Sequence, residues 1–352
     1  MNTYAQRRAC LRQSLDTNRV LVITSLENVR YLTGFSGSNA VCAIGRDVEF
    51  IGTDGRYVDQ VAQQAPDLTA IIDRDTLSAV LSKFPGAQIE VEESTTAMDL
   101  GMCQKHDATT IVHASRVAPL RMIKDEQELA LITTACDITV RALSALASEL
   151  VVGMSEIWIA RRLEQLFGEF GAQDRAFETI VGAGSHSAIP HHRPDSTAIR
   201  PGDFLVVDCG ARVDGYHADM TRTFLVAAEP KAWQSELHAA VWESQTLARA
   251  EVRDGASSAT LDSVARSSLT AAGLGQEFTH GLGHGVGLQI HEPPFLGPRA
   301  TGSIAAGMTI TVEPGAYLPG RGGVRIEDTL AVTASGAQVL TEASRALDIV
   351  AV

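Results

Sequence analysis

The chain has 352 residues, of which 45% are hydrophobic and 20% charged, and its formal net charge is −13. This length suggests two domains, and the apolar content is that of an ordinary globular protein with full cores. A chain this acidic has no basic face for phosphate groups, which excludes nucleic acid as a partner and argues equally against an anionic membrane surface.

The sequence gives no indication of a membrane span or a secretion signal. It contains no apolar run of about 18 residues or more, and residues 1–15 lack the apolar core of a signal peptide. The five cysteines form no CxxC or CxxH pair, so neither a disulfide framework nor a thiolate zinc site is expected. These features predict a protein of the reducing cytoplasm.

The first third of the chain alternates strand-like and helix-like segments, which predicts a small α/β domain. Strands are expected at 20–24, 41–44, 48–52, 70–72 and 88–91, and helices at 57–65, 77–84 and 96–106. Pro119 breaks this pattern, and a charged helix start follows at Asp125. The predicted domains are therefore residues 1–120 and 125–352.

The second part begins with a long amphipathic helix, because apolar residues recur every three or four positions from Leu129 to Leu150. Ser155 can cap a second helix. The remaining predicted elements are strands at 177–182, 204–210 and 216–226, helices at 231–252 and 257–272, and strands at 288–291, 309–313, 323–328 and 329–332. A helix pair followed by strands thus occurs twice, which indicates a coarse internal duplication of architecture.

Two aspartates lie in one predicted hairpin of this second part. Its β runs flank Asp214–Gly215, a strong hairpin signal, and folding about that turn brings Asp208 and Asp219 to within about one pair of each other. Asp208 has apolar neighbours, and buried carboxylates that face each other repel. The hairpin contains no Lys, so a metal ion between the aspartates is the economical explanation, while a salt bridge to Arg212 or Arg222 stays equally open.

Two glutamates lie in the later strands. Glu313 ends a β run before a Pro-Gly pair, and Glu327 lies in a run whose alternation places it on one face with Arg325. Taken alone, these residues also fit an exposed surface hairpin.

Histidines gather in the glycine-rich segment THGLGHGVGLQIHEPP, whose four glycines permit close backbone approach. The segment contains His280, His284 and His291, and a further pair, His191 and His192, lies upstream. Together with the four acidic residues, one imidazole makes a hard, oxygen-rich ligand set. Such a set suits two divalent ions such as manganese, with cobalt or zinc able to substitute.

These residues resemble the ligand signature of the pita-bread metallopeptidases, which include methionine aminopeptidase, aminopeptidase P and prolidase. The matching positions are Asp208 in VVDCGA, Asp219 in YHADMTRTF, His284 in HGLGHGVGL, Glu313 in TVEPG and Glu327 in GGVRIEDT. NVRYLTGFSGSNA at 28–40 and TDGRY at 53–57 resemble the creatinase-type N-terminal domain of the proline-specific branch. The resemblance implies an α/β (α+β) chain with a small creatinase-like domain followed by a pita-bread catalytic domain.

The resemblance also implies an Xaa-Pro dipeptidase (prolidase) that acts on small proline-containing peptides as a homodimer. A hydroxide that bridges two divalent ions would attack the scissile carbonyl. Asp208 would chelate one ion, Asp219 and Glu327 would bridge both, and His284 and Glu313 would hold the second. The alternatives are an aminopeptidase P that acts on longer peptides and, more remotely, a non-catalytic binding module of the same fold.

Further roles are implied around the metals. Glu313 would shuttle a proton, His291 would stabilise the tetrahedral intermediate, and His191 would contact the substrate amide. His280 would line the pocket near the proline ring. Two positions depart from the family pattern. His192 stands where relatives usually have a small or apolar residue, and Phe295 stands where some dipeptidases have an Arg. The basic residues left to meet a substrate carboxylate are Arg299 and Arg325.

Overall fold

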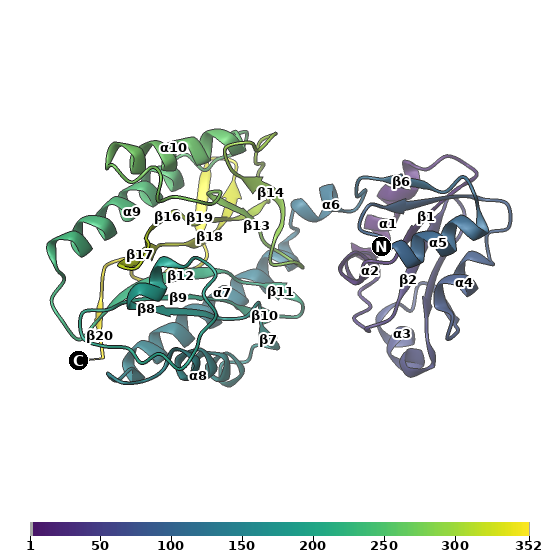
Figure 1. The fold of residues 1–352 in the computed structure, drawn as a ribbon. Helices are drawn as coiled ribbons and strands as arrows, with labels where there is room; N and C mark the ends of the chain where they lie inside the picture. Colours follow the sequence, from purple (N-terminus) through teal and green to yellow (C-terminus); the bar gives the residue numbers. More distant parts are fainter. Residues whose placement is uncertain (1–2, 352) are drawn as a thin grey trace. The chain divides into compact units, whose positions relative to one another are not determined.

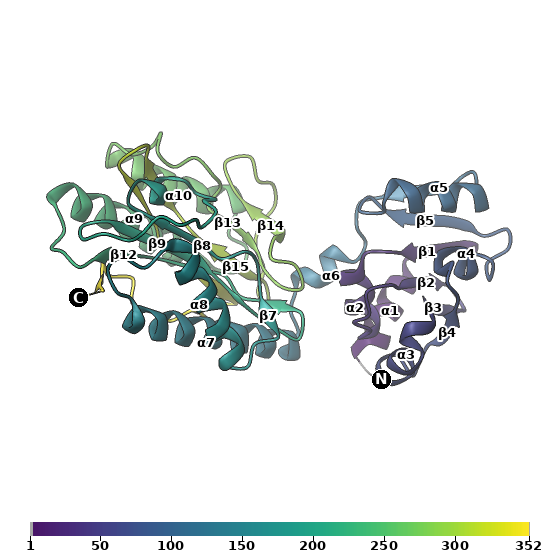
Figure 2. The same ribbon diagram turned by 60° about the horizontal axis from the view of Figure 1, so that its bottom comes forward.

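The polypeptide divides into two units, Met1–Arg121 and Met122–Val352, which are described separately (Figures 1 and 2). The structure is a computed structural model that describes residues 3–351.

The N-terminal unit is built on a six-stranded mixed sheet with the strand order β4-β3-β2-β1-β5-β6. Its strands are β1 (Arg19–Ile23), β2 (Val41–Gly45), β3 (Glu49–Thr53), β4 (Thr69–Ile72), β5 (Gln88–Glu92) and β6 (Ile111–His113). Its helices are α1 (Thr3–Gln13), α2 (Leu26–Thr33), α3 (Val58–Gln64), α4 (Thr76–Leu81), α5 (Ala97–His106) and α6 (Ala118–Met122), with a 3₁₀ turn η1 (Gly55–Tyr57). Alternating residues of the strands, such as Val20 and Val22, pack against Leu77 and Val80 of α4.

Pro119 was expected to mark the end of the first domain, and the two units divide close to it, between Arg121 and Met122. Pro119 lies in the first turn of the short helix α6. The missing N–H has no intrahelical partner in a first turn, so Pro is tolerated there. The sequence patterns missed α2 and β6.

The C-terminal unit contains two larger sheets and two helix pairs. The sheets have the strand orders β20-β12-β9-β8 and β14-β13-β15-β18-β19, and smaller ones are formed by β11-β10-β7 and β16-β17. The helices are α7 (Glu126–Glu149), α8 (Glu156–Glu169), α9 (Ala232–Ala250) and α10 (Ser258–Ala271), with a 3₁₀ turn η2 (Gly184–Ala188). The strands are β7 (Asp174–Arg175), β8 (Ile180–Ala183), β9 (Phe204–Cys209), β10 (Ala211–Val213), β11 (Tyr216–His217), β12 (Met220–Val226), β13 (Gly283–Gly285), β14 (Glu292–Leu296), β15 (Thr309–Val312), β16 (Gly315–Leu318), β17 (Gly322–Arg325), β18 (Asp328–Thr333), β19 (Gly336–Val339) and β20 (Ile349–Val350).

Each helix pair covers one sheet. Helices α7 and α8 share a core with β8, β9 and β12, while α9 and α10 share a core with β15 and β18 (Figure 1). This arrangement is the duplication that the order of the predicted elements indicated. The sheets meet between the helix pairs, which leaves the strand ends and loops of both halves available to build one site.

Helix α7 is apolar and long enough to cross a membrane by composition, with a mean hydropathy of 1.5. Its side chains Ile132, Leu143 and Leu146 are buried in the unit, so packing against the sheet accounts for its apolar stripe. Asp125 and Ser155 cap α7 and α8, as the sequence predicted for both helix starts.

The strand expected at 288–291 is wrong, because the chain bends through this segment and pairing resumes only in β14. Three of the four preceding glycines have no room for a Cβ next to neighbouring backbone. Such glycines permit tight bends that a regular strand would not make. Four of the five cysteines are buried free thiols, as expected for small apolar residues, whereas Cys10 is exposed.

Candidate metal centre and active site

The two aspartates lie on one hairpin with an unbroken register. Asp208 pairs with Thr221 across β9 and β12, and Val213 pairs with Tyr216 at the turn. Asp214 and its following glycine have φ angles of 44° and 76°, as the primed turn of a tight hairpin requires. Asp219 lies two residues before Thr221, so the two aspartates are diagonal neighbours on one face.

The other three predicted ligands come from the second half of the unit. His284 lies in β13, Glu313 directly follows β15, and Glu327 lies between β17 and β18. His284 Nε2 is 3.5 Å from Asp219 Oδ2 and 3.4 Å from Glu313 Oε1. One ligand atom each from Asp219, His284 and Glu327 lie within 4.8 Å of one another. The structure thus brings residues from both halves into one acidic cluster.

Burial and mutual repulsion act strongly on this cluster. Burial, followed by the charges of Glu327 and Asp208, raises the pKa of Asp219 well above its ordinary value. Burial likewise raises the pKa of Glu327 well above its ordinary value and that of Glu313 to about 8. Burial lowers the pKa of His284 to about 4, which keeps the imidazole neutral as a metal ligand must be.

The donor set fits divalent cations. Asp208 Oδ1 is buried and has no hydrogen-bond partner among the described residues, which is costly for a carboxylate oxygen without a bound cation. Four carboxylates in one pocket need positive charge between them. Oxygen-rich sites with one imidazole suit ions such as manganese, and cobalt or zinc can also bind them.

Arg325, expected on one face with Glu327, supplies one positive charge to the cluster through a pairing with Asp208 that the sequence did not predict. Its Nη2 lies 2.7 Å from Asp208 Oδ2, its Nε donates to Thr221 Oγ1 at 3.0 Å, and its Nη1 donates to Tyr317 OH at 2.8 Å. The side chain is 4% exposed. The salt bridge that was left open for Asp208 therefore exists, but its partner comes from β17 and not from Arg212 or Arg222.

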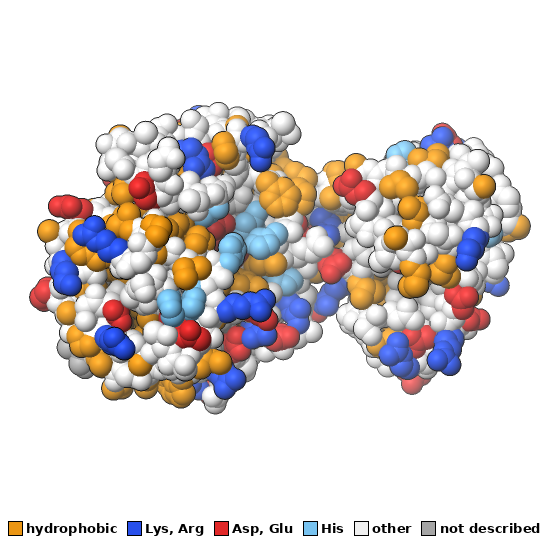
Figure 3. Space-filling model, in the orientation of Figure 1, with side chains coloured by type: hydrophobic (Ala, Val, Ile, Leu, Met, Phe, Trp, Pro, Cys, Tyr) orange, Lys and Arg blue, Asp and Glu red, His pale blue; other side chains and the backbone are white. Residues whose placement is uncertain are grey.

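A pocket of about 970 Å³ opens onto the cluster, and histidine side chains gather on one face of this unit (Figure 3). All the residues proposed from the sequence line it: Asp208, Asp219, His284, Glu313, Glu327, His191, His291, His280, Arg299 and Arg325. Phe177 adds an apolar wall to the pocket. The pocket therefore brings the predicted ligands, the imidazoles and several arginine side chains to one volume.

The imidazoles are held in different ways. His291 packs edge-on against the ring of His284 at a centroid distance of 4.4 Å, and burial lowers its pKa. His280 Nε2 lies 2.9 Å from Tyr317 OH, and Arg266 donates to the His280 backbone oxygen at 2.8 Å. The sequence patterns missed Arg266 and Arg193, both of which line the pocket, because neither lies in a motif.

Comparison with known proteins agrees with this architecture. The model of metallopeptidase family M24 matches residues 130–334, and that of the creatinase/prolidase N-terminal domain matches residues 7–123. The chain belongs to metallopeptidase family M24. The predicted family and the predicted fold, a creatinase-type domain followed by a pita-bread domain, are confirmed.

Similar proteins cover nearly the whole M24 chain. An uncharacterized peptidase of Bacillus subtilis, YqhT, is 33% identical over 93% of this chain and 94% of its own. The Xaa-Pro dipeptidase structure from Bacillus anthracis has a TM-score of 0.95 at 32% identity and covers 99% of this chain and 100% of that one. The X-Pro aminopeptidase structure from Thermotoga maritima has a TM-score of 0.90 at 31% identity, with the same two coverages.

Proposed function

We propose that this M24 chain is an exopeptidase that hydrolyses the bond between a first residue and a following proline in small peptides. The observation that carries the proposal is the buried cluster of four carboxylates and one imidazole at the wall of the pocket. All five predicted ligand residues are present, which argues against a binding module without metal. The similar structures that are named for cleavage before proline support the specificity.

Two divalent ions bound by the five ligands would lower the pKa of a bound water to about 7 and polarise the scissile carbonyl. Glu313 accepts the proton of the attacking water and returns it to the proline nitrogen, which carries no N–H in the substrate and must be protonated to leave. His291 donates a hydrogen bond to the developing oxyanion. His191 contacts the substrate amide, and His280 borders the proline ring.

Manganese is the ion that we propose for the cell, in a homodimer located in the cytoplasm. The oxygen-rich ligand set supports manganese, whereas the dimer follows from the family resemblance alone. Chelation should abolish hydrolysis of Met-Pro, and manganese should restore it. Full activity in verified metal-free protein would rule out the metal mechanism, and sedimentation of a monomer would rule out the dimer.

Dipeptides ending in proline are the proposed preferred substrates. A dipeptide brings its carboxylate close to four acidic ligands, so a basic group must meet it. The guanidinium of Arg325 already donates hydrogen bonds to Asp208, Thr221 and Tyr317. Arg299, in contrast, is exposed at the pocket. We therefore assign the carboxylate contact to Arg299.

An aminopeptidase acting on longer peptides is the second candidate. Phe295 lines the pocket with 56% of its surface exposed and brings no charge to a carboxylate. The pocket volume of about 970 Å³ also leaves room beyond a dipeptide. Identity does not separate the candidates, because the dipeptidase and the aminopeptidase structures are 32% and 31% identical to this chain.

The ratio of kcat/KM for Met-Pro and Met-Pro-Ala separates them. A preference of about tenfold for the tripeptide would make the enzyme an aminopeptidase, since about 1.4 kcal/mol of transition-state stabilisation would then favour the longer chain. If the dipeptide is preferred, Arg299→Ala should reduce that preference. Arg193→Ala is the matched control, because Arg193 is the other exposed arginine of the pocket.

A further inference from the structure

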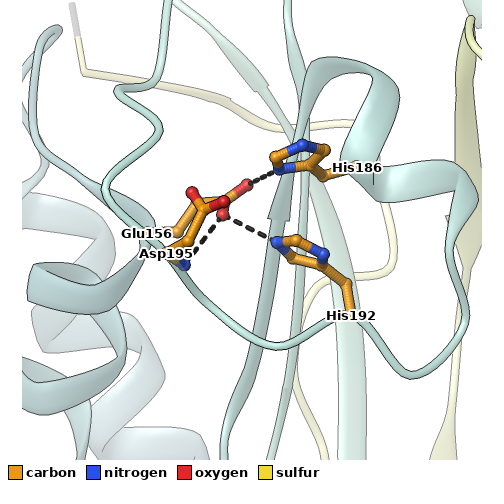
Figure 4. Close-up of side chains that lie close together, drawn as sticks. All are labelled: Glu156, His186, His192 and Asp195. Carbon is orange, nitrogen blue, oxygen red and sulfur yellow. Dashed lines mark hydrogen bonds and ion pairs between the residues drawn. The ribbon is translucent and has the colours of Figure 1, made fainter.

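A second cluster of ligand-type side chains surrounds Glu156, outside the five residues assigned to the catalytic metals. Glu156 is the first residue of α8, and its side chain is 0% exposed. His186 Nδ1 lies 2.9 Å from Glu156 Oε1, and His192 Nε2 lies 2.8 Å from Glu156 Oε2. Figure 4 shows both imidazoles directed at this carboxylate, with Asp195 beside it.

We propose that Glu156, His186, His192 and Asp195 form a mononuclear zinc site. One ligand atom from each residue lies within 4.8 Å of the others. Bonds of about 2.0–2.2 Å in a tetrahedron put neighbouring ligand atoms roughly 3.4 Å apart. The two imidazoles must therefore move away from Glu156 by about half an ångström, and Asp195 must approach, which side-chain rotations allow.

The charges and ligand types suit this ion. Two carboxylates balance the double charge of zinc, and two neutral imidazoles complete a four-coordinate set of nitrogen and oxygen ligands. Hydrogen bonds from Thr197 lower the pKa of Asp195, which keeps this carboxylate ionised. Asp195 is exposed, so an ion can enter from solvent on its side.

The surrounding backbone already orients the central ligand. The backbone N–H groups of Ala183 and Asp195 donate to Glu156 Oε1 and Oε2 at 2.8 Å and 3.2 Å. Glu156 N donates to Thr197 O, and Ile157 N donates to Asp195 O, both at 3.0 Å. Outer contacts of this kind hold ligands in position for a metal. The two segments that carry Glu156 and Asp195 are thus joined by main-chain hydrogen bonds.

The site adjoins the catalytic pocket through one loop. The segment that bears His192 also carries Pro190, His191 and Arg193, which line the pocket. Pro190 O accepts a hydrogen bond of 3.3 Å from Arg325, the partner of Asp208. A zinc ion would cross-link this loop to α8 and hold His191 in place. If the proposed peptidase function holds, zinc in this site should lower the KM for Xaa-Pro peptides.

Metal content tests the site without reference to catalysis. In the full chain, Asp219→Asn with His284→Gln disables the catalytic centre, and zinc bound after dialysis is then measured by atomic absorption. About one zinc per chain should remain and should be lost on adding either His186→Gln or His192→Gln, as the ligand count of a four-coordinate site requires. His238→Gln, a buried histidine of α9 outside the cluster, is the matched control and should keep the ion.

Two results would overturn the proposal. Absence of zinc would leave a Glu156–imidazole hydrogen-bond cluster only, and zinc that survives either added substitution would exclude the four-ligand site. If the disabled chain does not fold, the same comparison is made in the chain with its catalytic ligands intact, where His186→Gln should lower the zinc content by about one ion per chain. Cobalt provides a second readout, because its visible spectrum distinguishes a tetrahedral site from an octahedral one. None of these measurements depends on the peptidase assignment.

Discussion

Replacing Arg325 with Met should destabilise the metal-free protein far more than the manganese-bound protein. Arg325 is the buried cation paired with Asp208, in a cluster of four carboxylates. Breaking a buried ion pair on one side costs about 3–5 kcal/mol, because the remaining charge is left uncompensated. Bound manganese would compensate Asp208 in place of the guanidinium, so the loss in the metal-bound protein should be smaller.

The difference between the two states has a size that can be measured. If manganese restores at least about 1.4 kcal/mol of the loss, then by linkage Arg325→Met binds manganese at least about tenfold more tightly than the natural chain. Tryptophan fluorescence during urea unfolding suits this measurement, because Trp158, Trp233 and Trp242 all lie in the C-terminal unit. The titration is done with and without saturating manganese.

Tyr317→Phe is the control for lost hydrogen bonding. It removes one partner of Arg325 but no charge, and should cost about 0.5–1.5 kcal/mol in both states. Equal losses for Arg325→Met with and without manganese would refute the electrostatic reasoning and leave Arg325 with a role in packing and hydrogen bonding only.

Three further predictions concern other parts of the C-terminal unit. Glu313→Gln should lower kcat by at least about a hundredfold, because it removes the general base but keeps the shape; near-normal turnover would exclude the assigned role. Burial lowers the pKa of His238 to about 4. Between pH ~6.5 and 4, His238 therefore binds a proton in the unfolded chain but stays neutral in the folded chain. His238 should therefore contribute a fall of up to about 3 kcal/mol in the free energy of unfolding between pH ~6.5 and 4. In urea titrations His238→Gln should lose this contribution and keep that of His284, whose pKa burial also lowers to about 4. In Gly210→Ala, the added Cβ would lie 1.9 Å from Ala218 O, next to Asp219. We expect the free energy of unfolding to fall by about 1–3 kcal/mol and calorimetry to show weaker manganese binding. Unchanged values would show that the hairpin relaxes at no cost.

Local patterns predicted much of the fold, because they depend on neighbours in the sequence. The Asp214–Gly215 turn has the positive φ angles that its residue types favour. Helix α7 begins where the charged start at Asp125 indicated, and α8 begins at the cap that Ser155 indicated. The segment at 288–291 was misread because β-type residues there were weighed without the glycines before them.

The sequence by itself determined which residues are candidate ligands, since acidic residues in apolar strands and histidines among glycines are visible without a structure. Only the tertiary structure decided which side chains meet. Asp208 and Arg325 are 117 residues apart, and Glu156 and His192 are 36 apart. No local pattern encodes either contact, because each depends on how separate elements pack. The physical reason is that backbone preferences act over a few residues, whereas the charge partner of a buried carboxylate is chosen by the packing of the whole unit.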